Sequence, residues 1–273
     1  MGIFGKYFKV FDKPPFFSSF ISVRINTWEK KLNKKQVLID LANKATQLGG
    51  DSYLSDGLLV WGRVIGWFRD PKFLNSCDRA DVDGKNFTNS AIAWRTHVAC
   101  WAATQALSVE GDFFEFGCYE GYSAAVIHSF MGEEFTKTFQ RKHYWFDLFD
   151  EGHGGTDKKV KLDQTSSERY SLIRASKFKD ISVIKGDVIH TYVKNQDFNL
   201  KKVAFAHFDL NDADIELAVI QKACLNANKG TVFLFDDFAM SPFRRQNKMY
   251  RDFFRKINLE ILELPTGQGL IIF

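Results

Sequence analysis

Residues 111–123 read GDFFEFGCYEGYS and combine an apolar run, two glycines and the start of a helical pattern. The run Phe113–Phe116 predicts a short buried strand, Gly117 and Gly121 predict a turn, and residues 122–131 predict a helix. In α/β sheets this junction lies at the carboxyl end of a strand, where nucleotide-like cofactors bind. The spacing E-x-G-x-x-x-G differs from the fingerprint G-x-G-x-x-G, which argues against a dinucleotide.

Strand and helix patterns alternate through the rest of the chain, which predicts a parallel sheet covered by helices. Two strands separated by only five residues, 259–264 and 270–273, end the chain and must be antiparallel. We therefore expect a Rossmann-like, seven-stranded, mostly parallel sheet with a C-terminal antiparallel hairpin. The other predicted strands are 143–147, 181–184, 203–208 and 231–235, and the predicted helices are 89–107, 167–178, 215–225 and 242–257.

Residues 1–87 carry different patterns and predict a helical N-terminal extension ahead of an α/β domain over residues 88–273. Helices are expected over residues 34–48 and 52–68, and a solvent loop over residues 70–87. Phe4, Phe8 and Phe11 have helical spacing in a basic segment, residues 1–31. That segment fits a helix that docks on its own domain or on a second subunit better than a helix on a membrane surface. We expect the extension to serve substrate choice or homo-oligomer contacts.

Composition describes an ordinary globular protein of 273 residues, with a net charge of +4 and a pI near 8.7. There is no dense basic stripe interleaved with aromatic residues, so nucleic acid is not an expected partner. No apolar run reaches the length of a membrane span. The four cysteines are far apart and form no C-x-x-C pair, which favours a reducing, cytoplasmic location.

Acidic residues stand at the ends of the predicted strands, and the carboxyl ends of parallel strands share one edge of a sheet. Asp147 is placed to accept hydrogen bonds from both ribose hydroxyls of a cofactor. Glu115, just before the glycine turn, is placed for an ammonium group at the cofactor's amino-acid end. Asp187 is placed for the adenine amino group, and Gly186 allows a close approach there.

Asp209, Asp236 and Asp237 end two strands that are neighbours in this architecture. Three carboxylates without a histidine or cysteine ligand motif suit a hard cation, with Mg²⁺ before Ca²⁺ or Mn²⁺. The alternative is neutralisation by a basic side chain, for which Arg244 and Arg245 are available.

With these residues in place, the chain from about residue 88 to residue 273 resembles a known family, the class I S-adenosylmethionine-dependent methyltransferases related to macrocin and mycinamicin O-methyltransferases. Those enzymes methylate sugar hydroxyls. The matching segments are GDFFEFG at 111–117 with Gly121, FDLFDEG at 146–152, KGD at 185–187, FDLN at 208–211, Gly230 leading to FDDF at 235–238, and LPTGQG at 264–269.

The resemblance implies an S-adenosylmethionine site and a magnesium site made by Asp209, Asp236 and Asp237. Some relatives carry a second acid where this chain has Asn211, a departure that bears on the metal. The expected cofactor-binding residues are Glu115, Gly117, Glu120, Gly121, Tyr122, Ser123, Asp147, Gly186 and Asp187.

The reaction implied is methyl transfer by in-line displacement to a hydroxyl of a sugar, a glycosylated small molecule or a glycan. A divalent cation would lower the pKa of the hydroxyl. Asp209, His153 and His207 are alternative general bases, and Gln268 either holds substrate or, as we prefer, braces the last turn. Two other readings are a nicotinamide-dependent enzyme on the same sheet and a methyltransferase-like scaffold that has lost catalysis.

Overall fold

The computed structural model describes residues 8–9, 24–25, 52–82, 92–149 and 167–273. The helix predicted over residues 34–48, and His153, lie outside these ranges. The chain forms two compact units: residues 1–53 with 59–64, and residues 54–58 with 65–273. No helix in the described ranges has the length and apolar character needed to span a bilayer.

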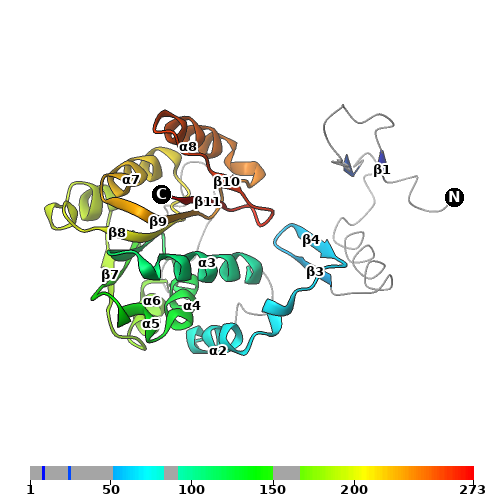
Figure 1. Ribbon diagram of the computed structural model, residues 1–273, viewed down its shortest axis with the longest axis horizontal. Helices are drawn as coiled ribbons and strands as arrows, with labels where there is room; N and C mark the ends of the chain where they lie inside the picture. The colour runs from blue at the N-terminus through cyan, green and yellow to red at the C-terminus, as the bar shows by residue number, and fades with distance from the viewer. Residues whose placement is uncertain (1–7, 10–23, 26–51, 83–91, 150–166) are drawn as a thin grey trace. The chain divides into compact units, whose positions relative to one another are not determined.

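The larger unit contains a sheet of seven strands in the order β10-β11-β9-β8-β5-β6-β7 (Figure 1). The central strand β5 (Asp112–Phe116) pairs in parallel with β6 (His143–Asp147) and β8 (Val203–Phe208). Parallel pairing continues to β7 (Ile181–Lys185) and to β9 (Ala227–Phe235), while β11 (Gly269–Ile272) is antiparallel to both β9 and β10 (Leu262–Glu263). The predicted mostly parallel sheet with a C-terminal antiparallel hairpin is confirmed.

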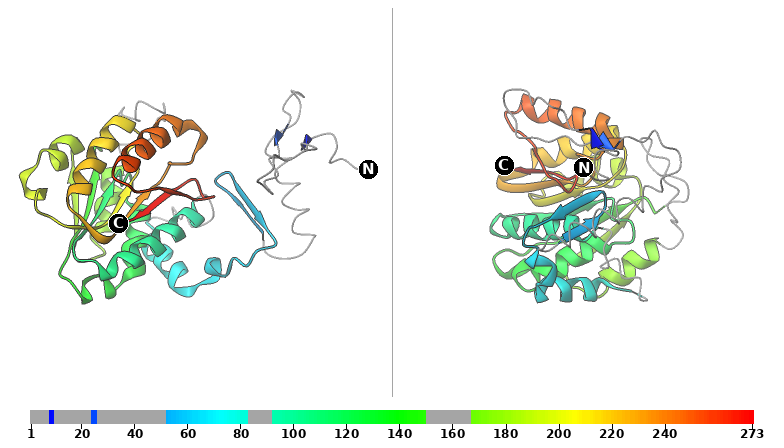
Figure 2. Two further views of the ribbon diagram at one scale, coloured as in Figure 1. Left: turned by 45° about the horizontal axis from the view of Figure 1, so that its top comes forward. Right: turned by 90° about the vertical axis from the view of Figure 1, so that its right-hand side faces the viewer.

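Helices cover both faces of the sheet, as Figures 1 and 2 show. One layer contains α2 (Pro71–Ala80), α3 (Ala93–Gln105), α4 (Tyr122–Met131) and α6 (Ser167–Ala175), and the other contains α7 (Ala213–Leu225) and α8 (Arg244–Lys256). The short helices are η2 (Gly66–Arg69), η4 (Ala106–Ser108), α5 (Glu134–Lys137), η5 (Ile189–Val193), η6 (Gln196–Phe198) and η7 (Ser241–Phe243).

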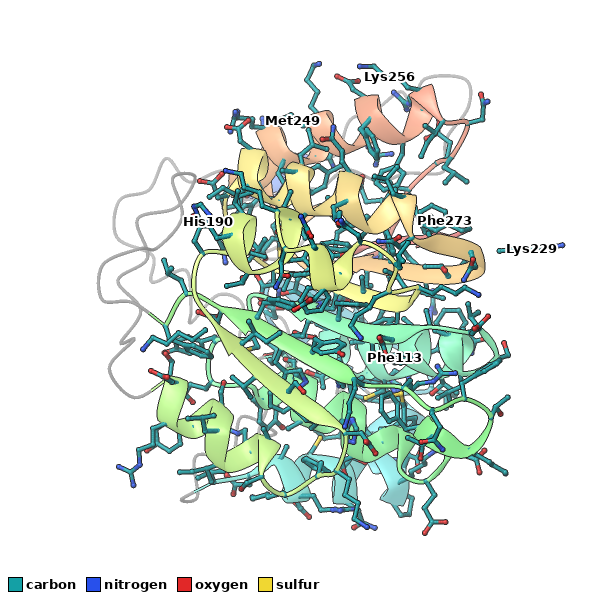
Figure 3. The ribbon with its side chains drawn as sticks, turned by 90° about the vertical axis from the view of Figure 1, so that its left-hand side faces the viewer. Phe113, His190, Lys229, Met249, Lys256 and Phe273 are labelled. Atoms are coloured by element: carbon teal, nitrogen blue, oxygen red, sulfur yellow. The ribbon has the colours of Figure 1, made fainter. Side chains whose placement is uncertain are left out.

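Phenylalanine fills the core on both faces of the sheet. Because side chains alternate along a strand, Phe113 packs in the cluster with α3 and α4, whereas Phe116 packs in the cluster with α7 and α8. At the carboxyl edge, rings from four adjacent strands stack 5.2–5.3 Å apart in the order Phe146, Phe116, Phe208, Phe235. Figure 3 shows these layers with side chains, with Phe113 in the sheet and Met249 on α8. The stacked rings form an apolar floor beneath the acidic strand ends.

The helix predicted over residues 52–68 is wrong. Ser52–Ser55 (β3) and Leu58–Trp61 (β4) form a two-stranded sheet, followed by the short helix η2. Asp56 and Gly57, which join the strands, have φ values of 53° and 76°. An Asp-Gly pair between two short apolar runs is a hairpin signal, because such a turn needs two consecutive positive φ angles.

The loop predicted over residues 70–87 is also wrong where the structure describes it, because Pro71–Ala80 is the helix α2. Asp70 caps this helix through a 2.9 Å hydrogen bond from Lys72 N, and Pro71 occupies its first position. Asp-Pro therefore starts a helix here, since proline lacks only an N–H that a first turn leaves unpaired. Phe8–Lys9 (β1) pairs with Arg24–Ile25 (β2), so the helical spacing assigned to Phe8 is wrong too.

Candidate active site

The carboxyl ends of β6, β5, β8 and β9 lie in consecutive positions across the sheet. Main-chain hydrogen bonds continue just past the strands: Gly117 N donates to Phe146 O at 2.9 Å, and Asp209 N donates to Phe116 O at 2.8 Å. Asp236 N likewise donates to Phe208 O at 2.9 Å. The residues predicted at four strand ends are thus brought to one edge, as parallel pairing requires.

The glycine turn is built for close packing of main chain. Gly117 has a φ of 89°, and a Cβ there would lie 2.0 Å from the carbonyl oxygen of Asp209. Gly121 has a φ of 74°, and a Cβ there would lie 2.9 Å from the Trp145 ring. Gly117 is among the expected cofactor-binding residues, and its Cβ position faces the end of β8. Only glycine meets both the φ value and the contact distance.

Asp147 lies against this turn. Its Oδ2 accepts a hydrogen bond from Tyr119 N at 2.7 Å, and its Oδ1 accepts one from Phe149 N at 3.0 Å. Burial raises the pKa of Asp147, and these N–H donors partly oppose that rise. The carboxylate therefore fixes the conformation of the glycine turn. Its predicted contact with a ribose stays a prediction.

Glu115, His207 and Asp236 form a buried line of charged groups. Glu115 Oε1 lies 2.8 Å from His207 Nδ1, and His207 Nε2 lies 3.5 Å from Asp236 Oδ1. The side chains of Glu115 and His207 are 3% and 4% exposed. Glu115 Oε2 is buried and has no hydrogen-bond partner among the residues that the structure describes. A buried carboxylate oxygen of this kind suits a cationic ligand group.

The charge on His207 follows from these contacts. Burial lowers the pKa of the imidazole, but the carboxylates of Glu115 and Asp236 outweigh burial and raise it well above the usual value. A protonated imidazole held between two acids has no lone pair with which to accept a proton. The geometry of His207 therefore does not suit the role of general base.

Arg95, near the start of α3, is a cation of the acidic cluster that no sequence pattern indicated. Its NH1 group donates to Asp236 and to Asp237, the latter at 3.3 Å, and its Nε lies 2.5 Å from Asp56 Oδ2. Asp236 lies 141 residues further along the chain, so no local pattern marks the pair. Arg245, one of the two arginines considered from the sequence, pairs with Asp214 at 2.6 Å instead.

Gln268 braces the same cluster. Its Nε2 donates to Asp236 Oδ1 at 3.0 Å and to Arg95 O at 3.3 Å, and its Oε1 accepts from Thr266 Oγ1 at 3.0 Å. The side chain thus links the terminal hairpin turn to α3 and to the end of β9. Bracing the turn was the preferred expectation for Gln268, and these contacts agree with it.

Asp209 has no ion pair with a lysine or arginine in the described part of the chain. Asn211 Nδ2 donates to its Oδ1 at 3.3 Å. Burial, with the charges of Asp236 and Asp237, raises the pKa of Asp209 well above its usual value. The donor chemistry is that of a hard cation, but Arg95 lies on two of the three carboxylates. No group of three or more His, Cys, Asp or Glu residues in the described ranges is arranged around one ion. This arrangement does not fit a resident magnesium ion.

The remaining predicted residues have structural partners. Glu120 Oε2 lies 3.6 Å from the buried Arg174, and the Tyr122 hydroxyl hydrogen-bonds the Cys77 thiol. Ser123 is half-buried in the first turn of α4. Asp187 Oδ1 accepts from Ile189 N, the first residue of η5, at 2.8 Å, and Gly186 N donates to Asp147 O at 3.0 Å.

No protein-family model and no curated protein matches the chain. Among solved structures, CalS11, a calicheamicin methyltransferase, has a TM-score of 0.57 at 17% identity, over 66% of this chain and 79% of CalS11. The O-methyltransferase NovP has a TM-score of 0.54 at 14% identity, over 87% of this chain and 98% of NovP. The chain has an α/β methyltransferase fold. An apo structure of CalS11, described as TDP-rhamnose 3'-O-methyltransferase, has a TM-score of 0.49 at 19% identity, over 66% of this chain and 80% of that chain.

Proposed function

We propose that this protein is an S-adenosylmethionine-dependent O-methyltransferase that acts on a hydroxyl of a sugar or a glycosylated small molecule. The observation that carries the proposal is the buried Oε2 of Glu115, which has no hydrogen-bond partner among the described residues and lies beside the glycine turn that Asp147 holds. The fold supports it, since CalS11 and NovP share the fold and both are methyltransferases. The sugar acceptor is proposed from the resemblance of the sequence motifs to the sugar O-methyltransferases related to macrocin and mycinamicin O-methyltransferases.

In this proposal, different residues at the sheet edge bind different parts of the cofactor. Glu115 Oε2 accepts the ammonium of the amino-acid end, Asp147 binds the ribose, and Gly186 with Asp187 lies at the adenine. When bound, S-adenosylmethionine supplies a methyl group on a positively charged sulfur. Among the described residues, the site carries more carboxylates than cations, which are Arg95 and His207, and this favours a cationic cofactor.

Asp209 is the proposed general base. When the methyl carbon bonds to the acceptor oxygen, its bond to sulfur breaks and leaves a neutral thioether, and the hydroxyl proton would pass to Asp209 in its ionised form. The raised pKa of Asp209 makes that carboxylate the stronger base. Asp209 is adjacent to the glycine turn, because its carbonyl packs on Gly117, and no lysine or arginine within the described ranges pairs with it. His153 lies outside those ranges. Magnesium assistance stays a prediction from the sequence and carries no step, because Arg95 supplies positive charge at Asp236 and Asp237.

The acceptor is proposed to be a small molecule or glycan and not nucleic acid. The basic side chains of α8 support this, because several are paired: Arg245 with Asp214, Arg251 with Glu263 and Arg255 with Glu260. We further propose a cytoplasmic homo-oligomer in which residues 1–87 serve acceptor choice or subunit contacts. The four cysteines are free thiols, as a reducing compartment would keep them.

Calorimetric titration of the full chain with S-adenosylmethionine, S-adenosylhomocysteine and NAD tests the cofactor assignment. We expect the first two to bind and NAD not to bind. Transfer of a radiolabelled methyl group to a panel of sugar nucleotides, including TDP-rhamnose, then tests the acceptor class. Binding of NAD alone would support the hypothesis of a nicotinamide-dependent enzyme. Binding of none of the three would support the hypothesis of a methyltransferase-like scaffold without catalysis.

A further inference from the structure

We propose that His207 is a positioning residue that joins the cofactor end of the site to the acidic cluster, by holding Glu115 on one side and Asp236 on the other. The inference rests on the proposed function for what binds at each end. It differs from the expectation that His207 is a base, because here the ring touches neither substrate nor cofactor and acts only through two carboxylates.

Strand register places these groups in one row. Glu115 on β5 is the register partner of His207 on β8, and His207 is the register partner of Leu234 on β9, one residue before Phe235 and two before Asp236. Register partners on adjacent strands project to the same face of a sheet. The imidazole therefore lies between a carboxylate on one neighbouring strand and a carboxylate at the end of the other.

The ring holds one oxygen of Glu115 and leaves the other free. Glu115 Oε1 is 2.8 Å from His207 Nδ1, whereas Oε2 is buried with no hydrogen-bond partner in the part of the chain that the structure describes. Because the side chain is almost fully buried, rotating the carboxylate would break the contact with His207 without gaining one from water. Because the two oxygens are chemically equivalent, what His207 fixes is the orientation of the Glu115 carboxylate, with the second oxygen presented to a ligand.

The two oxygens of Asp236 also have different partners. Its Oδ1 accepts from Gln268 Nε2 at 3.0 Å, and its Oδ2 accepts from Arg95. Oδ1 also lies 3.5 Å from His207 Nε2, which makes no hydrogen bond within the described ranges, so this contact is an ion pair only. A continuous line of contacts thus runs from Glu115 through His207 and Asp236 to Arg95. We infer that loss of His207 alters both cofactor affinity and turnover, although the ring is only 4% exposed.

The main experiment measures S-adenosylhomocysteine affinity by calorimetry in His207→Phe, Glu115→Gln and the double variant. Each single change should weaken binding on the order of 10-fold or more, the scale of a hydrogen bond to a charged group. The double variant should be little worse than Glu115→Gln alone, because His207 acts through Glu115. Fully additive losses, or wild-type affinity in His207→Phe, would overturn the proposal.

His143→Phe is the matched control. His143 on β6 is also fully buried, but neither ring nitrogen has a hydrogen-bond partner within the described ranges, and its neighbours are rings such as Phe113 and Trp145. This variant should keep wild-type affinity. If it weakens binding as much as His207→Phe does, the effect is a general response to core changes and the proposal fails.

A second measurement needs no cofactor and no activity. In the full chain labelled with ¹⁵N-histidine, the Nδ1–H of His207 should give a slowly exchanging downfield proton signal that Glu115→Gln and Asp236→Asn both shift. His143→Phe should leave that signal in place. If the wild-type protein binds no cofactor yet shows both shifts, the proposed function fails and the bridge stands. If the signal responds to neither carboxylate, the bridge is absent.

Discussion

Two buried histidines on the same sheet, His207 at its carboxyl edge and His143 at the start of β6, behave in opposite ways. Burial lowers the pKa of His143 well below its usual value, and nearby His128 and His207 lower it further. His207 is as deeply buried, yet Glu115 and Asp236 raise its pKa well above the usual value. Burial is common to both residues, so the difference comes from the acids that parallel strands collect at one edge.

The largest effect is expected from Asp209→Asn, a variant that tests whether the reaction takes place at the carboxyl edge of the sheet. Asp209→Asn should lower kcat by about 10²–10⁴-fold, the usual contribution of a general base, because the amide cannot take the hydroxyl proton. S-adenosylhomocysteine affinity, measured by calorimetry, should change little, since Asp209 acts on the acceptor. A variant with wild-type kcat would remove Asp209 from the chemistry.

The stability of the region at the amino ends of the strands, where His128 packs on His143, should fall in acid. Burial lowers the pKa of His128, which stacks on His143, to about 4 from 6.5. The unfolded chain takes up the proton first, so this group's contribution to stability is present above pH 6.5 and is lost as pH falls towards 4. The loss is about 3 kcal/mol at 1.4 kcal/mol per pH unit. In His128→Phe, urea unfolding at pH 4.5 and 7.5 should show a smaller decrease than in the wild type. An unchanged pH slope would contradict the prediction.

Glu216 on α7, behind the carboxyl edge, should respond in the opposite direction. Its Oε2 accepts from Leu210 N at 2.7 Å, and burial raises its pKa to about 7 from 4.5. The unfolded chain loses the proton first, so stability falls as pH rises from about 4.5 to about 7, by about 3 kcal/mol. Glu216→Gln should remove that fall in urea unfolding measured at pH 5 and 8. If His128→Phe and Glu216→Gln changed the pH dependence of the unfolding free energy in the same direction, the two edges of the sheet would not differ in the way proposed.

Asp147→Ala tests the cofactor contact at the same edge. Loss of the carboxylate should weaken S-adenosylmethionine binding by about 1.5–3 kcal/mol, the usual worth of hydrogen bonds to a charged group. Asp112→Ala is a suitable control, because Asp112 accepts from Lys142 N at the start of β5, at the opposite end of the strand. Equal losses in the two variants would show that the effect is not specific to the carboxyl edge.

The smallest effect concerns the cation at Asp236 and Asp237. An ion at these carboxylates must displace the Arg95 guanidinium, so Arg95→Gln should bind Mn²⁺ or Mg²⁺ several-fold more tightly than the wild type in calorimetry. The same titration tests whether the wild-type protein binds magnesium. A second test of the magnesium prediction is the activity of the wild-type protein in excess EDTA. Tight metal binding that Arg95→Gln leaves unchanged would show that Arg95 does not occupy the ion's place.

Local pattern was enough to identify the sheet, its C-terminal hairpin and most of the acids at its edge. Each strand is marked by a short apolar run, and the glycines and acids that follow it lie within a few residues of that run. Parallel strands bring their carboxyl ends together wherever they pair, so Gly117, Gly121 and these acids meet at one edge. The same reasoning failed at residues 52–61, where short apolar runs fit a helix or a strand and the Asp56-Gly57 turn decides.

Which charged groups meet at that edge depended on the folded chain. Arg95 reaches Asp236 across 141 residues, and His207 reaches Glu115 across 92. Strand register brings His207 to Glu115, and the packing of α3 brings Arg95 to Asp236, and a short stretch of sequence records neither. The sequence thus specified where carboxylates gather, because that follows from local strand geometry. The partners that set their charge came from tertiary packing, because electrostatic interaction depends on distance in space and not on distance along the chain.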